Sequence, residues 1–213
     1  MEIIALSGWR GAGKDTVADH LVRKHGYIQL SFASVLKQEV SRIYDIPEKW
    51  CSHPEYKNRP LEQYPVRGVD AWGIEIQRML NQELRSGYWT PRALCILEGS
   101  GRRTVDPNYW VNEVAKQIND MPIYLTKFVI SDLRFQSEVA GLHRLIEEKD
   151  KLEVWRVNRQ DDIDTQTPSE RDMDKYKFDV QLRNHGSLKE LYKQIDVLMS
   201  DSIRSIRWNR IKW

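Results

Sequence analysis

The sequence predicts an α/β fold with a parallel sheet. Short apolar runs typical of buried strands alternate along the chain with segments of helical periodicity, which is the order found in βαβ units. The first apolar run, at residues 3–6, leads into a Gly-rich segment at residues 8–16 that reads GWRGAGKDT, and a helical pattern follows. This strand–loop–helix order is the context in which the pattern G-x-x-x-x-G-K binds phosphate.

The remaining elements follow from local patterns. Asp106-Pro107 predicts a helix start, with Asp as the N-cap and Pro in the first turn, and Ser187 to Glu190 form a capping box that opens the last helix. Residues 47–69 are rich in Pro, Tyr and charge, and we expect an irregular insertion there. Strands are expected at residues 2–7, 27–32, 127–131, 152–157 and 178–182, and further helices at residues 14–25, 33–44, 71–86, 91–97 and 136–147.

Composition and charge narrow the class of protein. The chain has 213 residues, 40% hydrophobic and 30% charged, which fits one soluble globular domain with insertions. Its net charge of +2 gives no global attraction to nucleic acid, and no stretch approaches the roughly 20 apolar residues of a membrane span. The chain shows no signal-peptide pattern, and Cys51 and Cys95 lack metal-ligand spacing, which is typical of idle thiols in a reducing compartment. We therefore expect a cytoplasmic enzyme with no nucleic-acid or membrane partner.

The Gly-rich segment predicts a nucleoside triphosphate site. Glycines let consecutive backbone N–H groups turn toward a phosphate, and the N-terminus of the following helix adds a partial positive charge. Lys14 can reach the β and γ phosphates as a point cation, and the hydroxyl of Thr16 is placed to contact the phosphates. The alternative is a Gly-rich turn without a ligand. The residues expected at ATP are Trp9, Arg10, Gly11, Ala12, Gly13, Lys14, Asp15 and Thr16.

Two carboxylates are the candidate Mg²⁺ ligands. Asp132 follows the apolar residues 127–131, and a carboxylate at the end of a strand beside a phosphate loop holds Mg²⁺ directly or through water. Asp15 stands where Ser or Thr is usual, so we expect it to complete the metal shell or to face the acceptor. The alternative for Asp15 is an ordinary first-turn charge favoured by the helix dipole. Arg134, two residues beyond Asp132, is the candidate for stabilising charge on the transferring phosphoryl group.

An ordered set of motifs runs through nearly the whole chain. It comprises G-K-D-T at residues 13–16, F-A-x-x-L-K at 32–37, T-P-R at 90–92, G-x-x-x-R at 99–103, P-x-x-W-V at 107–111, D-x-R-x-x-x-E at 132–138, S-E at 169–170 and N-x-G-S at 184–187. With these motifs the chain resembles the phage-type deoxynucleoside monophosphate kinases, a branch of the P-loop kinases. The resemblance implies ATP-dependent phosphorylation of deoxynucleoside monophosphates for DNA precursor synthesis in a phage or virus. It also implies a three-layer α/β/α fold with a five-stranded parallel sheet and, in many members, a homodimer.

The resemblance also assigns residues to the two substrates. Lys37 and Arg92 would bind the acceptor phosphate. The Asn184–Ser187 turn, with Asn184 and Gly186 as ATP contacts, would form part of the adenine pocket. The flap departs from the family pattern D-x-H-x-[ST]-E, because residues 164–170 lack the His and are one residue longer. The remaining acceptor candidates are Arg103 as a further cation, Trp72 and Trp155 as walls for the base, and Asp164, Ser169 and Glu170 of the flap.

We expect a single P-loop kinase domain. Its parts are a core at residues 1–46 and 120–201, an acceptor-binding insertion at 47–119, a lid at 158–175 and a basic tail at 202–213. One alternative is another small-molecule kinase, because the G-K-D loop resembles that of phosphomevalonate kinases and the N-x-G-S helix is similar to that of dephospho-coenzyme A kinases. An alternative from another class is a nucleotide-dependent protein that binds nucleic acid through its basic, Trp-containing tail.

Overall fold

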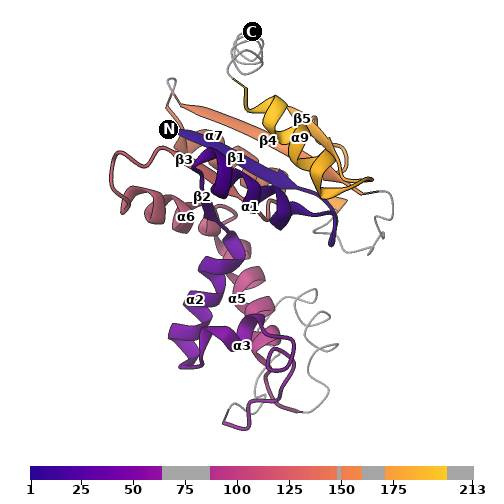
Figure 1. The fold of residues 1–213 in the computed structure, drawn as a ribbon. Coiled ribbons are helices and arrows are strands. Elements are labelled where there is room, and N and C mark those ends of the chain that lie inside the picture. Colours follow the sequence, from indigo (N-terminus) through magenta and orange to yellow (C-terminus); the bar gives the residue numbers. More distant parts are fainter. Residues whose placement is uncertain (64–86, 148–149, 160–170, 201–213) are drawn as a thin grey trace. The chain divides into compact units, whose positions relative to one another are not determined.

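The first part of the fold is a sheet of five parallel strands. The structure, a computed structural model, describes residues 1–63, 87–147, 150–159 and 171–200 (Figure 1). Within these residues all strand pairs are parallel, which confirms the predicted fold class. In spatial order the strands are β2 (Ile28–Leu30), β3 (Lys127–Ile130), β1 (Glu2–Ser7), β4 (Lys151–Asn158) and β5 (Val180–Arg183).

Helices cover both faces of this sheet, which gives the three-layer arrangement. Strand side chains of one parity, among them Leu6 and Val157, are buried against α1 (Lys14–His25) and α9 (Leu188–Leu198). Strand side chains of the other parity, such as Ile3 and Ile130, are buried as well. Figure 1 shows α7 (Gln136–Leu145) on that second side of the sheet. Burial on both faces explains why the strands are continuous apolar runs with no polar alternation.

Two compact units make up the chain. The first contains the sheet and comprises residues 1–31 and 117–213, and the second comprises residues 32–116. The second unit contains α2 (Phe32–Tyr44), α3 (Glu48–Ser52), α5 (Pro91–Val105) and most of α6 (Tyr109–Asn119). The boundaries of the core, insertion and lid stated above stay predictions.

A small apolar core and a polar network hold the second unit together. Its buried apolar side chains are Val40, Ile46, Cys51, Leu61 and Leu94. Arg102 pairs with Glu39 at 3.0 Å and with Glu98 at 3.1 Å, and its guanidinium lies 5.1 Å from the ring centroid of Tyr109. Because Tyr109 also donates to Glu39 at 2.8 Å, the network joins α2, α5 and α6. Arg102 therefore has a structural role in this unit.

Several predicted boundaries need correction. The strand predicted at residues 27–32 ends at Leu30, because the buried Phe32 begins α2. The helix predicted at residues 91–97 continues to Val105 through Gly99, whose lack of a side chain suits its close approach to Leu36 on α2. Asp106 ends α5 as its C-cap, and α6 begins only at Tyr109.

The insertion also differs from its prediction. The segment predicted to be irregular at residues 47–69 contains the short helix α3. The helix predicted at residues 71–86 lies outside the described residues. None of the helices in the described ranges is both long and apolar enough to cross a membrane.

Candidate functional site

The Gly-rich loop joins β1 to α1 and requires glycine at Gly13. Gly13 is the N-cap of α1 and has φ 103°, a backbone conformation that a residue with a Cβ rarely adopts. A Cβ at this position would also lie 2.4 Å from Nδ2 of Asn184. That Nδ2 donates to the carbonyl oxygen of Ala12 at 2.8 Å. The loop is therefore fixed against the turn that follows β5, which lies 172 residues further along the chain.

Lys14 is the first residue of α1 and reaches back across the loop. Its Nζ donates to the carbonyl oxygens of Gly8 at 2.7 Å and Trp9 at 2.9 Å. Asp15 follows in the first helical turn and is exposed. An ammonium group and the N-terminus of a 12-residue helix thus lie together, an arrangement that attracts anions.

A cavity of about 450 Å³ opens beside the loop. The turn at Asn184–Gly186 forms its other wall and leads into α9, so residues at the N-termini of two helices line the same cavity. Its volume falls in the range of small-molecule sites. The lining residues are Gly11, Gly13, Lys14, Asp15, Thr16, Arg159, Asn184, His185, Gly186 and Leu188.

His185 belongs to the turn that was expected at the adenine, whereas two other lining residues, Arg159 and Leu188, were not predicted as ligands. Nη1 of Arg159 donates to the carbonyl oxygen of Gly11 at 3.2 Å. A signal for Arg159 was available, because it follows directly after β4, and polar residues at the carboxyl ends of parallel strands gather at one edge of the sheet.

Arg156 supports the start of the loop from β4. Only 8% of its side chain is exposed, and it pairs with Asp174 at 3.0 Å and donates to Oγ of Ser7 at 3.4 Å. Its guanidinium also lies 5.9 Å from the ring centroid of Trp9 and 5.4 Å from that of Phe178. These contacts occupy the guanidinium, so Arg156 positions the loop rather than a ligand.

Asp132 and Arg134 follow β3 at the same edge of the sheet. Asp132 is half-buried, and its Oδ2 accepts from Oγ of Ser31 at 3.0 Å. Arg134 is exposed, while its backbone N–H donates to Glu138 at 2.9 Å at the start of α7. Asp132 lies outside the lining of the cavity, whereas Asp15 is part of it. Carboxylate oxygens of this kind suit a hard cation such as Mg²⁺.

The expected acceptor-binding cations lie in the second unit. Lys37, Arg92 and Arg103 are all half-buried. Nη1 of Arg103 donates to the carbonyl oxygen of Gly99 at 3.2 Å, and the backbone N–H of Arg92 donates to the carbonyl of Lys57 at 2.9 Å. Lys37 lies on α2, and Arg92 and Arg103 lie on α5.

Of the aromatic and flap candidates for the acceptor site, the structure describes one, Trp155. Trp155 is fully buried in the core between the sheet and α1 and α9, and its Nε1 donates to Glu153 at 2.7 Å. A base-wall role does not fit this position, because no face of the indole is accessible to a ligand. The other candidates, Trp72, Asp164, Ser169 and Glu170, lie outside the described residues.

The two cysteines are neighbours in the second unit. Both are free, and they interact with each other although they lie far apart in the sequence. The hydrogen bond with Cys95, together with the charge of Lys37, lowers the pKa of the Cys51 thiol. The same hydrogen bond and burial raise the pKa of Cys95.

The sequence was compared with family models and with known proteins. No family model matches the chain. A protein of Acanthamoeba polyphaga mimivirus, described as a "Putative deoxynucleotide monophosphate kinase", is 27% identical over 199 residues, which cover 92% of this chain and 94% of the relative. This relative confirms the resemblance that the motifs predicted.

Two solved structures are similar to the chain at low identity. TT1252 from Thermus thermophilus is 18% identical with a TM-score of 0.46. The matched region covers 92% of this chain and 95% of the TT1252 chain. The shikimate kinase from Aquifex aeolicus is 12% identical with a TM-score of 0.41, and covers 92% of this chain and 94% of its own.

Proposed function

We propose that this chain is a nucleotide kinase that transfers the γ-phosphoryl group of ATP to a deoxynucleoside 5′-monophosphate. The observation that carries the proposal is the cavity formed by the Gly-rich loop and the Asn184–Gly186 turn, with Lys14 at its wall. The mimivirus relative of similar length supports the choice of acceptor. We place the reaction in DNA precursor synthesis, in a cytoplasmic protein that acts without nucleic acid or a membrane.

The donor nucleotide would bind at the loop. Backbone N–H groups of the loop and Nζ of Lys14 are proposed to hold the β and γ phosphates, with Thr16 as a further contact. The Asn184–Gly186 turn would contact the adenine, and Arg159 adds a cation to the same cavity. Asp15 and Asp132 are the carboxylates proposed to hold Mg²⁺, which when bound neutralises charge on the phosphates.

The transfer step needs no general base, because the acceptor is already a phosphate oxygen anion. That oxygen forms a bond to the γ phosphorus while the bond from the γ phosphorus to the bridging oxygen breaks, and ADP leaves. The protein supplies alignment and charge neutralisation. Arg134 is the proposed cation at the transferring group, and Lys37, Arg92 and Arg103 are the proposed ligands of the acceptor phosphate.

A coupled assay of ADP release tests the proposal. The purified chain is given ATP, Mg²⁺ and, in separate reactions, each deoxynucleoside monophosphate, each ribonucleoside monophosphate, phosphomevalonate and dephospho-coenzyme A. We expect ADP release that depends on at least one deoxynucleoside monophosphate. Turnover with only phosphomevalonate or dephospho-coenzyme A would replace the nucleotide acceptor with that compound.

The same assay separates the binding-protein alternative. ATP hydrolysis that no monophosphate changes, together with DNA binding that weakens steeply with salt, would overturn the kinase proposal. We also propose that the chain forms a homodimer. Light scattering on the same sample measures the oligomeric state.

A further inference from the structure

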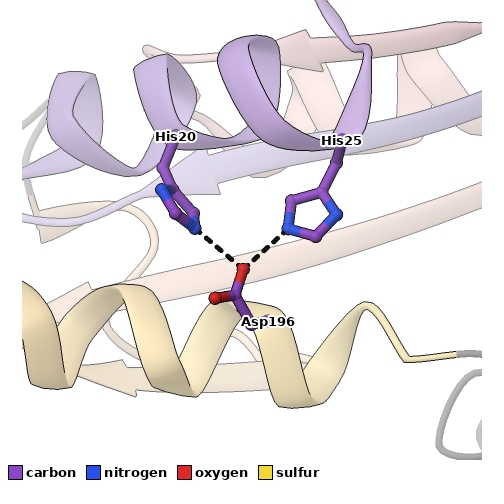
Figure 2. Close-up of side chains that lie close together, drawn as sticks. All are labelled: His20, His25 and Asp196. Atoms are coloured by element: carbon purple, nitrogen blue, oxygen red, sulfur yellow. Dashed lines mark hydrogen bonds and ion pairs between the residues drawn. The ribbon is translucent and has the colours of Figure 1, made fainter.

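Three side chains outside the lining of the nucleotide cavity converge on one point. His20 and His25 lie on α1, and Asp196 lies on α9 (Figure 2). The two imidazole Nε2 atoms lie 2.9 Å and 3.0 Å from the same carboxylate oxygen, Oδ1 of Asp196. The three potential ligand atoms lie within 4.8 Å of one another.

We propose that His20, His25 and Asp196 form a binding site for a transition-metal ion of the Zn²⁺ class. Two imidazole nitrogens and one carboxylate oxygen are ligands that Zn²⁺ accepts, and a water molecule would complete the tetrahedron. Ligand atoms about 2.0–2.1 Å from a tetrahedral Zn²⁺ are about 3.3 Å apart, so the two N···O distances need to widen only by a few tenths of an ångström. Imidazole ligands favour Zn²⁺ and its neighbours over Mg²⁺ or Ca²⁺.

The surroundings hold these ligands in place. The ring of Tyr192 stacks on His20 with the centroids 4.1 Å apart and the planes 6° from parallel. Nζ of Lys24 donates to Oδ2 of Asp196 at 2.7 Å, which fixes the carboxylate while Oδ1 faces the imidazoles. The side chains of His20 and His25 are only 11% and 17% exposed. The ammonium of Lys24 also places a positive charge beside the proposed ion, and this charge opposes the binding of a cation.

The site would join two helices that also form the nucleotide cavity. Residues at the N-termini of α1 and α9 line that cavity, whereas His25 and Asp196 lie toward their C-termini. At a rise of 1.5 Å per residue, His20 and His25 lie about 7.5 Å and about 15 Å from Asp15 along α1, so the ion would bind outside the nucleotide cavity. A bound ion would replace hydrogen bonds between the helices with coordinate bonds. It would therefore stabilise the folded state by mass action.

The test is a metal titration of the full chain without nucleotide. After treatment with a chelator and its removal, ZnCl₂ is added and followed by calorimetry and by thermal unfolding, and Co²⁺ is added and followed by its visible absorption. We expect one Zn²⁺ per chain, a rise in Tm, and the absorption of a tetrahedral Co²⁺ site. Excess Mg²⁺ should not compete.

Variants locate the bound ion. His20→Gln and His25→Gln should each weaken Zn²⁺ binding at least tenfold, since each removes a ligand, while the exposed His143→Gln serves as the matched control. Cys51→Ser tests the thiol pair as the competing zinc ligands. Binding that survives the two histidine changes but is lost in Cys51→Ser would overturn the proposal.

The wild-type result also decides the proposal without any variant. Absence of one-to-one Zn²⁺ binding, or a Co²⁺ spectrum of purely octahedral type, would reduce the cluster to a hydrogen-bonded contact between α1 and α9. Because the readouts are binding and Tm, they do not depend on the proposed kinase activity.

Discussion

The two ends of the helix pair α1 and α9 are built on different principles. At the N-terminal ends, the cavity depends on backbone conformation, because its lining includes Gly11 and Gly13, which both have positive φ, together with Gly186. In the second half of α1 and toward the C-terminus of α9, the cluster of His20, His25 and Asp196 is formed entirely by side chains. A backbone site leaves a compact motif in the sequence, because neighbouring residues must adopt a particular conformation. A side-chain site can be assembled from residues 171 positions apart, and leaves no local motif.

The largest expected effect concerns Lys14, the cation at the nucleotide cavity. Lys14→Ala should lower the rate of ATP-dependent phosphorylation at least ~100-fold, because it removes the positive charge that we propose stabilises the transferring phosphoryl group. The measurement is kcat in the coupled ADP assay. Lys116→Ala, which removes a side chain that is 67% exposed on α6, is the matched control and should keep wild-type activity. Activity near wild type in Lys14→Ala would remove the loop from the mechanism.

The two glycines that flank α1 sharpen the comparison next. Gly13→Ala should weaken ATP binding at least ~10-fold, because the new Cβ forces both a strained φ and the displacement of Asn184. Gly26→Ala at the C-cap has φ 72° but nothing within 4 Å of the added Cβ. It should therefore cost about 1 kcal/mol of stability and leave ATP affinity unchanged.

Calorimetric titration with ATP and urea unfolding of both glycine variants check this pair. Equal loss of ATP affinity in Gly26→Ala and Gly13→Ala would contradict the view that the loop end alone forms the nucleotide site.

A smaller effect is expected at the cluster of His20, His25 and Asp196. Lys24→Met should tighten Zn²⁺ binding about fivefold, since it removes a like charge beside the metal worth about 1 kcal/mol near water. Arg23→Met is the control, because Arg23 is 78% exposed and pairs with Asp19. Calorimetry of both variants measures the difference. Weaker binding in Lys24→Met would mean that its contact to Asp196 matters more than its charge.

The smallest effect concerns the cap of α9. Ser187→Ala should lower the free energy of unfolding by about 1 kcal/mol, because the hydroxyl accepts from the backbone N–H of Glu190 at 3.3 Å. Hydrogen bonds from the backbone and hydroxyl of Ser187 lower the pKa of Glu190. A lowered folded pKa contributes stability above the unfolded pKa that is lost as the pH falls through the folded value.

The stability difference between wild type and Ser187→Ala should therefore be largest near neutral pH and shrink below about pH 4. Urea unfolding at pH 7 and pH 3 measures it. A difference that grows in acid would contradict the assigned role of Ser187.

The fold was predictable wherever the local pattern and the tertiary contacts agree. The expected β1 at residues 2–7 and α1 at residues 14–25 match the structure, and so does the capping box before α9. The prediction was wrong at α5, which was expected to end at residue 97 and continues to Val105. Gly99 packs against Leu36, and Nε1 of Trp110 donates to the carbonyl oxygen of Gly99. These contacts stabilise the helix beyond residue 97.

For the site, the sequence by itself determined the Gly-rich loop, Lys14 and the turn at residues 184–187. Each depends on the conformation of a few consecutive residues, and composition and order carry that information. Only the tertiary structure decided that Asn184 anchors the loop, that Arg159 reaches it and that Trp155 is buried in the core. It also decided the His20–His25–Asp196 cluster. Such contacts depend on which strands lie side by side and which helices share a face, and the spacing of residues along the chain does not specify them.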